Sequence, residues 1–452
     1  MNNAKNMSEA DKRLLLKQLL ARQGNKNEQL AELVKNQQIS NDPTSFKEFR
    51  GYKELEEQAR IFQTLALKNP YFCVHEGISD HITQFEGKQY INYSGYNYLG
   101  LSGHPEVSAA AKQAIDQYGT SVSASRIVSG EIPIHAELEK KLAEIHDTEA
   151  AVALVSGYAT NVSIISHLFG PNDLILHDSL IHNSVITGCI LSGAKRLAFP
   201  HNDWQALSQM LQENRQAHER VLIIIEGVYS MDGDIPDLPR FLEIKKQYQC
   251  MLMVDEAHAA GVIGPHGFGS HDHFGIKGSE VDIWMGTLSK SFASCGGYIC
   301  GSQALIENIK YNAAGAILFS VGISPANTAA ALAAAKILQR EPERAARLRA
   351  HSTLFIERAK RYQLDIGSAS GTGVVPVITG NSVLCLKLGQ YLSEAGIYVH
   401  PILYPAVPES AARLRFFITS NLTADEVIYT VDTLAAAMQK FSKNEHTINS
   451  LQ

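Results

Sequence analysis

The sequence is poor in cysteine, and its cysteines are scattered. The 452 residues contain six cysteines and no Cys-x-x-Cys pair. Metal sites built on closely spaced cysteines are therefore not indicated, and a disulfide framework is not expected at this length. The pattern is typical of reduced thiols in a cytosolic protein, so we expect a cytoplasmic location and no metal ligands.

Long apolar runs and an excess of positive charge are also missing. No run approaches the roughly 20 apolar residues of a membrane helix, and the amino-terminal segment lacks the small-residue cleavage site of a secretory signal. The formal net charge is −6, which does not favour a nucleic-acid or anionic membrane surface. We therefore expect no membrane span and no nucleic-acid partner.

From about residue 100 the chain alternates helical patterns with strand-length apolar runs. Pro105–Tyr118 has helical spacing. The apolar runs are Ala151–Val155, Leu174–Leu176, Val221–Ile225, Met251–Val254 and Ile283–Met285. Such alternation predicts an α/β fold whose mostly parallel sheet is covered on both faces.

The pattern also predicts how the chain is divided. Residues 1–45 read as a helical extension and linker, 46–100 as an amino-terminal segment, 101–330 as a large domain and 331–445 as a smaller C-terminal α/β domain. Strands of that smaller domain are expected near Val374–Ile378, Val383–Leu386 and Leu414–Ile418. In the extension, a leucine stripe at helical spacing either packs on the body of the protein or docks a partner.

Polar motifs follow several of the predicted strands, where ligands bind in parallel sheets. Ser156–Asn161 combines a small-residue turn with a helix start, which suits a phosphate but also an ordinary capped helix. His182 follows the next strand, where a lone histidine is usually structural. Asp255 and His258 follow a third strand, either as an acid and base or as a helix cap with a hydrogen-bonded histidine.

Lys290 follows the last of these strands and is flanked by small and hydroxyl residues. Burial there lowers the pKa of a lysine, so that it attacks carbonyl groups. The order of anion cradle, histidine, acid and lysine matches the needs of pyridoxal 5′-phosphate (PLP). The phosphate needs a cradle, the pyridinium nitrogen a carboxylate, the ring a covering side chain and the aldehyde a lysine.

These motifs, taken together, resemble the α-oxoamine synthases, a family of PLP enzymes with the aspartate-aminotransferase-like fold. Its members include serine palmitoyltransferase, aminooxononanoate synthase, glycine acetyltransferase and aminolevulinate synthase. The resemblance runs from about residue 48 to 440. The matching segments are Asn92–Leu101, Tyr118–Arg126, Ser129–Gly130, His135–Glu139, Ser156–Asn161, Glu226–Asp234, Asp255–His258, Thr287–Lys290, Gly296–Gly297 and Ala412–Arg415.

The resemblance implies roles for individual residues. The catalytic residues would be Lys290, His182, Asp255 and His258. Lys290 would bind the cofactor's aldehyde, and Asp255 would pair with its pyridinium nitrogen. His182 would stack on the cofactor ring, and His258 would hydrogen-bond its phenolic oxygen. Further cofactor-binding residues would be Ser156, Gly157, Tyr158, Glu226, Ser230, Thr287 and Ser320, the last reaching the other subunit of a homodimer. The amino-acid substrate would contact Asn97, Arg126 and Arg415.

The implied reaction is a decarboxylative Claisen-type condensation. A small amino acid (glycine, alanine or serine) would join an acyl thioester, giving an α-amino ketone, CO2 and free thiol. The motifs leave open whether the donor is acyl-CoA or an acyl carrier protein. The leucine-rich helix at Ser8–Gln23 and the segment Tyr118–Arg126 favour a carrier protein and a natural-product pathway. The alternatives are an aminotransferase or decarboxylase of the same fold, or a non-catalytic PLP-binding subunit.

Overall fold

The computed structural model describes residues 44–449, with side chains as far as Phe441. The chain forms two compact units, divided in sequence between Asn69 and Pro70. The described part of the first unit is a short 3-10 turn and helix α3 (Arg50–Thr64). The leucine stripe predicted near the amino terminus lies outside the described residues.

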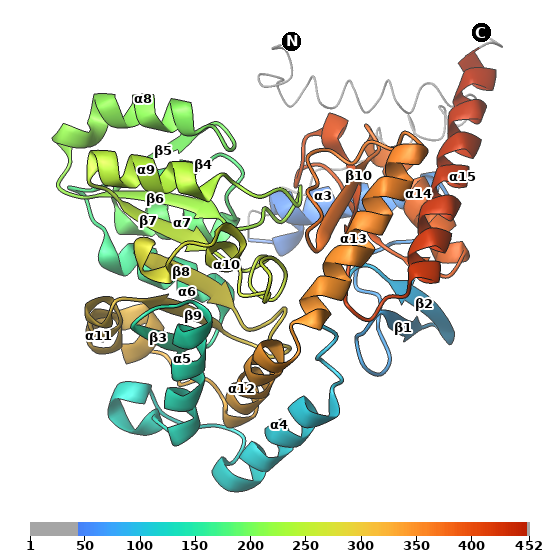
Figure 1. Ribbon diagram of the computed structural model, residues 1–452. Coiled ribbons are helices and arrows are strands. Elements are labelled where there is room, and N and C mark those ends of the chain that lie inside the picture. Colours follow the sequence, from blue (N-terminus) through green and yellow to red (C-terminus); the bar gives the residue numbers. More distant parts are fainter. Residues whose placement is uncertain (1–43, 450–452) are drawn as a thin grey trace. The chain divides into compact units, whose positions relative to one another are not determined.

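The main sheet of the second unit has seven strands, in the order β3-β9-β8-β7-β6-β4-β5. Strand β9 is antiparallel to both of its neighbours, and the other pairs are parallel. The strands are β3 (Ala150–Leu154), β4 (Leu174–Asp178), β5 (Lys195–Phe199), β6 (Val221–Glu226), β7 (Met251–Asp255), β8 (Ile283–Thr287) and β9 (Gly297–Gly301). Figure 1 shows β6, β7 and β8 side by side. The predicted mostly parallel sheet is confirmed.

Two strands of this sheet were not predicted from the sequence. Strand β5 is an edge strand that begins with exposed Lys195 and Arg196, so it lacks a continuous apolar run. Strand β9 is short and has a glycine at each end, a pattern typical of turns. Both segments form strands because they pair with neighbouring strands of the sheet, and not because of their own composition.

Successive residues of the central strands enter two separate cores. Leu174 and Leu176 of β4 belong to one cluster and Ile175 to the other. The first cluster includes side chains of α5 (Pro133–Ile145), α8 (Trp204–Asn214), α9 (Leu238–Tyr248) and α12 (Pro325–Arg340). The second includes side chains of α6 (Gly157–Leu168), α7 (Asn183–Ser192) and α11 (Gln303–Asn312). Burial on both faces explains why the strands read as continuous apolar runs.

Several helices begin at signals that are visible in the sequence. Proline is the first residue of α4 (Pro105–Tyr118), α5 and α12. At that position its missing N–H costs nothing, because the first backbone amides of a helix have no partner within it. Ser156 and Ser324 cap α6 and α12 by accepting hydrogen bonds from the amides of Ala159 and Asn327.

The C-terminal part contains an antiparallel sheet of β10 (Val374–Ile378), β13 (Arg413–Phe417) and β12 (His400–Ile402). The strands predicted near the first two are confirmed. The strand predicted at Val383–Leu386 is wrong, because these residues lie in helix α14 (Ser382–Glu394), which Asn381 caps. A four-residue apolar run does not distinguish a strand from a buried stretch of helix.

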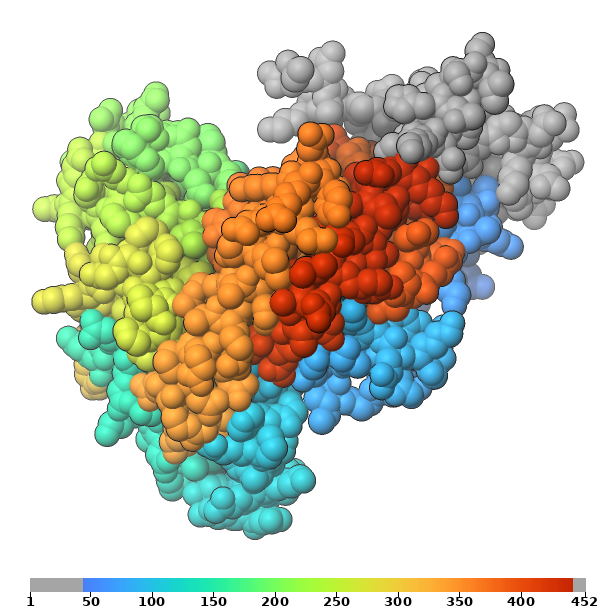
Figure 2. All heavy atoms as spheres, turned by 45° about the vertical axis from the view of Figure 1, so that its right-hand side comes forward, coloured from blue at the N-terminus to red at the C-terminus, as the bar shows by residue number. Residues whose placement is uncertain are grey.

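Helices α13 (Glu343–Arg361) and α15 (Ala424–Asn449) pack side by side (Figure 2). Arg358 of α13 forms a two-point ion pair with Asp432 of α15. A further small sheet joins β1 (Ile82–Phe85), β2 (Lys88–Asn92) and β11 (Ile397–Tyr398). The predicted division into four segments stays a prediction, and α12 runs across its last boundary at residue 330. Among the described helices, none has the length and apolarity to cross a membrane.

Candidate active site

The carboxyl ends of β6, β7 and β8 bring the predicted residues into one cavity. Glu226 ends β6 opposite Asp255 at the end of β7, and Lys290 follows β8 by three residues. The cavity has a volume of about 430 Å³, including space that opens to solvent. Nine of the predicted residues line it: Gly157, Tyr158, His182, Glu226, Ser230, Asp255, His258, Thr287 and Lys290.

Asp255 is buried, and both of its carboxylate oxygens accept hydrogen bonds. Oδ2 accepts from Asn161 Nδ2 at 2.9 Å, and Oδ1 accepts from the Ala257 amide at 3.0 Å. Asn161 also donates to Ser184 Oγ at 2.9 Å. Sequence reasoning gave Asn161 no role. Its position one helical turn after Gly157, on the cavity side of α6, was the signal that could have found it.

Lys290 lies on the cavity wall with no ion-pair partner among the described residues. Burial lowers the pKa of its ammonium to about 8, although the charges of Asp255 and Glu226 act in the opposite direction. Its Nζ lies 5.9 Å from the centre of the Tyr96 ring. A lysine with this pKa is partly neutral near pH 7, so it can act both as a nucleophile and as a proton carrier.

This pKa predicts how the cofactor-free enzyme takes up PLP. Only the neutral amine attacks an aldehyde, so the rate of attachment should rise with pH and level off above about 8. Stopped-flow absorbance of the PLP-loading reaction between pH 6 and pH 11 would measure it, with the Lys290→Ala enzyme as the background. A midpoint near the ordinary lysine value of 10.5 would contradict the buried environment.

His182 and Glu226 are linked on a second wall of the cavity. The His182 amide donates to Glu226 Oε1 at 2.7 Å, and the Ser230 amide donates to Oε2 at 3.3 Å. Burial, together with the nearby Asp255, raises the pKa of Glu226 well above its usual range. Burial lowers the pKa of His182, whose Nδ1 contacts Ser184 Oγ at 2.7 Å. A neutral imidazole of this kind can cover a cationic ring without charge repulsion.

His258 is buried against the Tyr98 hydroxyl, which lies 2.7 Å from its Nδ1. Burial raises the pKa of Tyr98 and holds the pKa of His258 well below its usual range. When the Tyr98 hydroxyl donates to Nδ1, the neutral imidazole carries its proton on Nε2. The ring is then a donor suited to an oxygen of a bound cofactor.

The start of α6 has the character of a phosphate cradle. Helix N-termini present free amides and a positive dipole end to an anion. A Cβ on Gly157 would lie 2.8 Å from Thr287 Oγ1, so this position has no room for a side chain. Ser156 does not line the cavity, because its hydroxyl caps the helix at the Ala159 amide. The cradle, the buried acid and the lysine fit the groups of PLP.

Five predicted residues lie outside the cavity lining: Asn97, Arg126, Ser156, Ser320 and Arg415. Arg126 is buried, and its guanidinium bonds Glu131, Glu139 and the Ala153 carbonyl. Asn97 is also buried; its Oδ1 accepts from the amides of Leu101 and Ser102, and its Nδ2 donates to Ser79 and Asp80. Both side chains therefore have structural partners. Ser320 is half-buried, and its hydroxyl donates to the carbonyl of its neighbour Val321.

Arg415, the third residue predicted to contact substrate, is half-buried on β13. Its Nη1 lies 3.1 Å from the Ser230 carbonyl and 3.2 Å from Met231 Sδ. Its Nε has no partner, and no carboxylate of the described residues lies within ion-pair distance of it. Its neighbour Arg413 differs, because it pairs with Asp232 at 2.6 Å. One edge of the Arg415 guanidinium is thus free for a ligand.

Comparison with known proteins gives the same assignment as this geometry. The family model for aminotransferase class I and II matches residues 88–434. The 8-amino-7-oxononanoate synthase of Fervidobacterium nodosum is 41% identical over 359 residues, covering 79% of this chain and 90% of that protein. The enzyme of the same name from Treponema denticola is 38% identical over 375 residues, covering 83% of this chain and 92% of that protein.

A solved structure of serine palmitoyltransferase from S. paucimobilis, with PLP and myriocin bound, superposes with a TM-score of 0.82. It is 27% identical and covers 86% of this chain and 98% of that one. These likenesses extend over the whole described sheet and the cavity, and they confirm the aspartate-aminotransferase-like fold and the PLP cofactor. The chain belongs to the α-oxoamine synthase family of PLP-dependent enzymes, within aminotransferase class I and II.

Proposed function

We propose that this enzyme condenses glycine, alanine or serine with an acyl thioester, releasing CO2 and free thiol and leaving an α-amino ketone. The observation that carries the proposal is the unpartnered Nε of half-buried Arg415, whose Nη1 bonds Ser230 on the lining of the cavity that holds Lys290 and Asp255. A guanidinium edge binds both oxygens of a carboxylate. An amino acid held this way would present its α-carbon to the groups of the cavity.

Each residue of the cavity has a distinct task in this proposal. When bound, PLP supplies an electron sink for the charge that develops at the amino acid's α-carbon. Asp255 would hold the proton on the pyridine nitrogen of the bound cofactor, and His258 would donate from Nε2 to its phenolic oxygen. Lys290, partly neutral near pH 7, takes the proton from the α-carbon and later returns one there. Arg415 binds the carboxylate until it leaves as CO2.

The reaction class is tested by its products. Purified enzyme would be mixed with each of the three amino acids and an acyl thioester, with mass spectrometry following the products. Thiol and CO2 should appear together with an amino ketone. A keto acid formed without thiol release would instead show an aminotransferase, and absence of cofactor absorbance would show a non-catalytic subunit.

The donor is proposed to be an acyl chain on a carrier protein, as in natural-product pathways, with acyl-CoA a weaker substitute. The proposal rests on Lys12, Arg13, Lys17 and Arg22 in the predicted leucine-rich helix, which would attract an acidic carrier. That helix lies outside the described residues. Deletion of residues 1–45 should reduce turnover with the carrier and spare turnover with acyl-CoA. Equal effects on both donors would contradict docking.

We also propose a homodimer with active sites at the subunit interface. Ser320 is half-buried on its own chain and is not part of the cavity lining. In the proposed dimer its hydroxyl reaches the phosphate in the other subunit. Sedimentation showing a fully active monomer would contradict this arrangement.

Replacing Arg415 by lysine should weaken binding of the amino acid without affecting the acyl donor. Lysine keeps the charge but lacks the two-pronged edge, so the KM of the amino acid should rise by roughly 10- to 100-fold. Steady-state kinetics with each substrate varied in turn would measure it. Arg358→Lys, which alters the ion pair with Asp432 on α15, is the matched control and should leave both KM values unchanged. An unchanged KM in Arg415→Lys would remove Arg415 from the site.

A further inference from the structure

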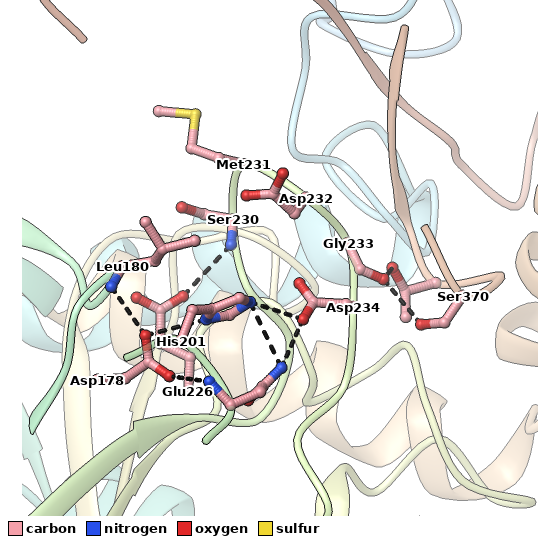
Figure 3. A network of polar contacts seen from close by, with 12 residues as sticks. Asp178, Leu180, His201, Glu226, Ser230, Met231, Asp232, Gly233, Asp234 and Ser370 are labelled. Atoms are coloured by element: carbon pink, nitrogen blue, oxygen red, sulfur yellow. Dashed lines mark hydrogen bonds and ion pairs between the residues drawn. The ribbon is translucent and has the colours of Figure 1, made fainter. Parts of the chain in front are cut away.

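The loop between β6 and Asp234 connects the cavity with the C-terminal sheet (Figure 3). Its Ser230 amide bonds Glu226, while the Ser230 carbonyl and the Met231 sulfur are the two hydrogen-bond partners of Arg415. The Arg415 guanidinium also lies over the Phe417 ring, 4.7 Å from its centre. Asp232, the next residue, pairs with Arg413 on the same strand as Arg415. The loop therefore supplies the hydrogen bonds that orient the Arg415 guanidinium above this ring.

Gly233 lets the backbone of this loop pack closely against strand β10. Its φ is +72°, and a Cβ there would lie 2.0 Å from the Val374 carbonyl oxygen. Its own carbonyl accepts hydrogen bonds from the hydroxyls of Ser370 and Thr372, both at 2.9 Å. The backbone of the loop is thus held closely on the side of the C-terminal sheet.

His201 holds the other side of the loop. Its Nδ1 lies 3.0 Å from Asp178 Oδ1, and its Nε2 lies 2.9 Å from Asp234 Oδ2. Figure 3 shows the imidazole between these two carboxylates. Asp178 ends β4 and is fully buried, and it also accepts from the amides of Leu180 and Asn202, both at 2.8 Å. Asp234 is therefore tied to the main sheet through the His201 imidazole and through Asn202, whose Nδ2 donates to the same Asp234 Oδ2 at 2.6 Å.

Both ring nitrogens of His201 face carboxylate oxygens, so both act as donors and the ring is an imidazolium. Burial opposes this charge, but the two carboxylates outweigh it and raise the pKa of His201 to about 10. The Tyr229 ring stands perpendicular to the imidazole at 4.4 Å. The Tyr229 amide donates to the Asp234 carbonyl at 3.1 Å, and this bond closes the loop.

We propose that His201 is a positioning residue, which, by clamping Asp234 to Asp178, holds the Ser230 carbonyl and the Met231 sulfur where they orient Arg415 for the amino-acid carboxylate. The inference rests on the proposed role of Arg415. No other described group accepts a hydrogen bond from the Arg415 guanidinium. A loop freed at Asp234 would no longer hold these two hydrogen-bond acceptors in place, and the Arg415 guanidinium would keep only its packing over the Phe417 ring.

The test compares His201→Gln, Arg415→Gln and the double variant as PLP-loaded enzymes. Glutamine is polar but does not bridge two carboxylates on opposite sides. Affinity for glycine, alanine and serine would be measured by titration, with the change in cofactor absorbance as the signal. His201→Gln should weaken that affinity by about tenfold, the effect of losing one charge-assisted hydrogen bond. The KM of the acyl thioester should change by less than about twofold.

The double variant separates positioning from a general loss of stability. If His201 acts through Arg415, adding His201→Gln to Arg415→Gln should cause little further loss of amino-acid affinity. Asp234→Asn, whose amide oxygen still accepts from Nε2, should keep most of the affinity that Asp234→Ala loses. His266→Gln, which removes a comparable His–Asp pair with Asp272 outside the cavity lining, is the matched control.

Three results would overturn the inference in distinguishable ways. If Arg415→Gln weakens amino-acid binding but His201→Gln does not, Arg415 keeps its proposed role and the clamp is structural only. If Arg415→Gln leaves amino-acid binding unchanged, the carboxylate role and the clamp fail together. Additive losses in the double variant would also overturn positioning through Arg415.

Discussion

Replacing Lys290 by alanine is expected to abolish turnover and covalent attachment of the cofactor. The described cavity lining contains no other lysine, and a lost acid–base group alone costs up to about 10⁴-fold. We therefore expect a loss of at least about 10³-fold in kcat. Cofactor absorbance, borohydride reduction and steady-state rates would measure the three consequences separately.

The control for this substitution is Lys360→Ala, which removes an exposed lysine of α13. It should retain normal absorbance and turnover. Borohydride-reducible attachment at another lysine in the Lys290→Ala enzyme would show that the cofactor is carried elsewhere. Retained turnover would exclude Lys290 as the acid–base group.

Replacing Asp255 by asparagine should lower kcat by about 10²- to 10³-fold while leaving the fold intact. A neutral amide no longer holds the proton on the pyridine nitrogen. The hydrogen bonds of Asp255 give a second reason to expect that the substitution is costly. Both oxygens accept from protein donors, Asn161 Nδ2 and the Ala257 amide. An asparagine must turn its own N–H groups toward one of them, which leaves a buried donor unpaired at a cost of about 1–3 kcal/mol.

Steady-state kinetics and thermal unfolding would separate the two effects of Asp255→Asn. Asp203→Asn is the matched control, because Asp203 caps α8 and asparagine serves equally well as a cap. It should leave both kcat and the unfolding temperature nearly unchanged. Near-normal activity in Asp255→Asn would show that the buried acid supports the fold only.

The central part of the cavity could be predicted from the sequence because it follows a rule of parallel sheets. Glu226, Asp255 and Thr287 each end an apolar run, and strands that run in the same direction place their carboxyl ends along one edge. The position of Asp255 along its own strand was sufficient to predict its place at this edge, whereas Glu226 and Thr287 were predicted from the family resemblance. Lys290 and His182 follow from the same rule, because each lies just beyond a strand end.

Other residues depend on partners that the local sequence does not reveal. Arg126 stands in a motif of the family, yet it bonds nearby Glu131 and also Glu139, which the folding of α5 brings beside it. Arg413 and Arg415 are alternate residues of one strand with the same chemistry, and only Arg413 has a carboxylate partner. The difference comes from Asp232 on a loop far away in sequence.

The sequence by itself determined the fold class, the succession of strands and the residues that end them, because strands buried on both faces consist of continuous apolar runs. Tertiary structure alone decided which buried charges are already paired and which are free for a ligand. His201 meets Asp178 and Asp234 only when two strand ends and one loop converge. Such pairings depend on distances of a few ångströms between distant segments, and no local pattern records them.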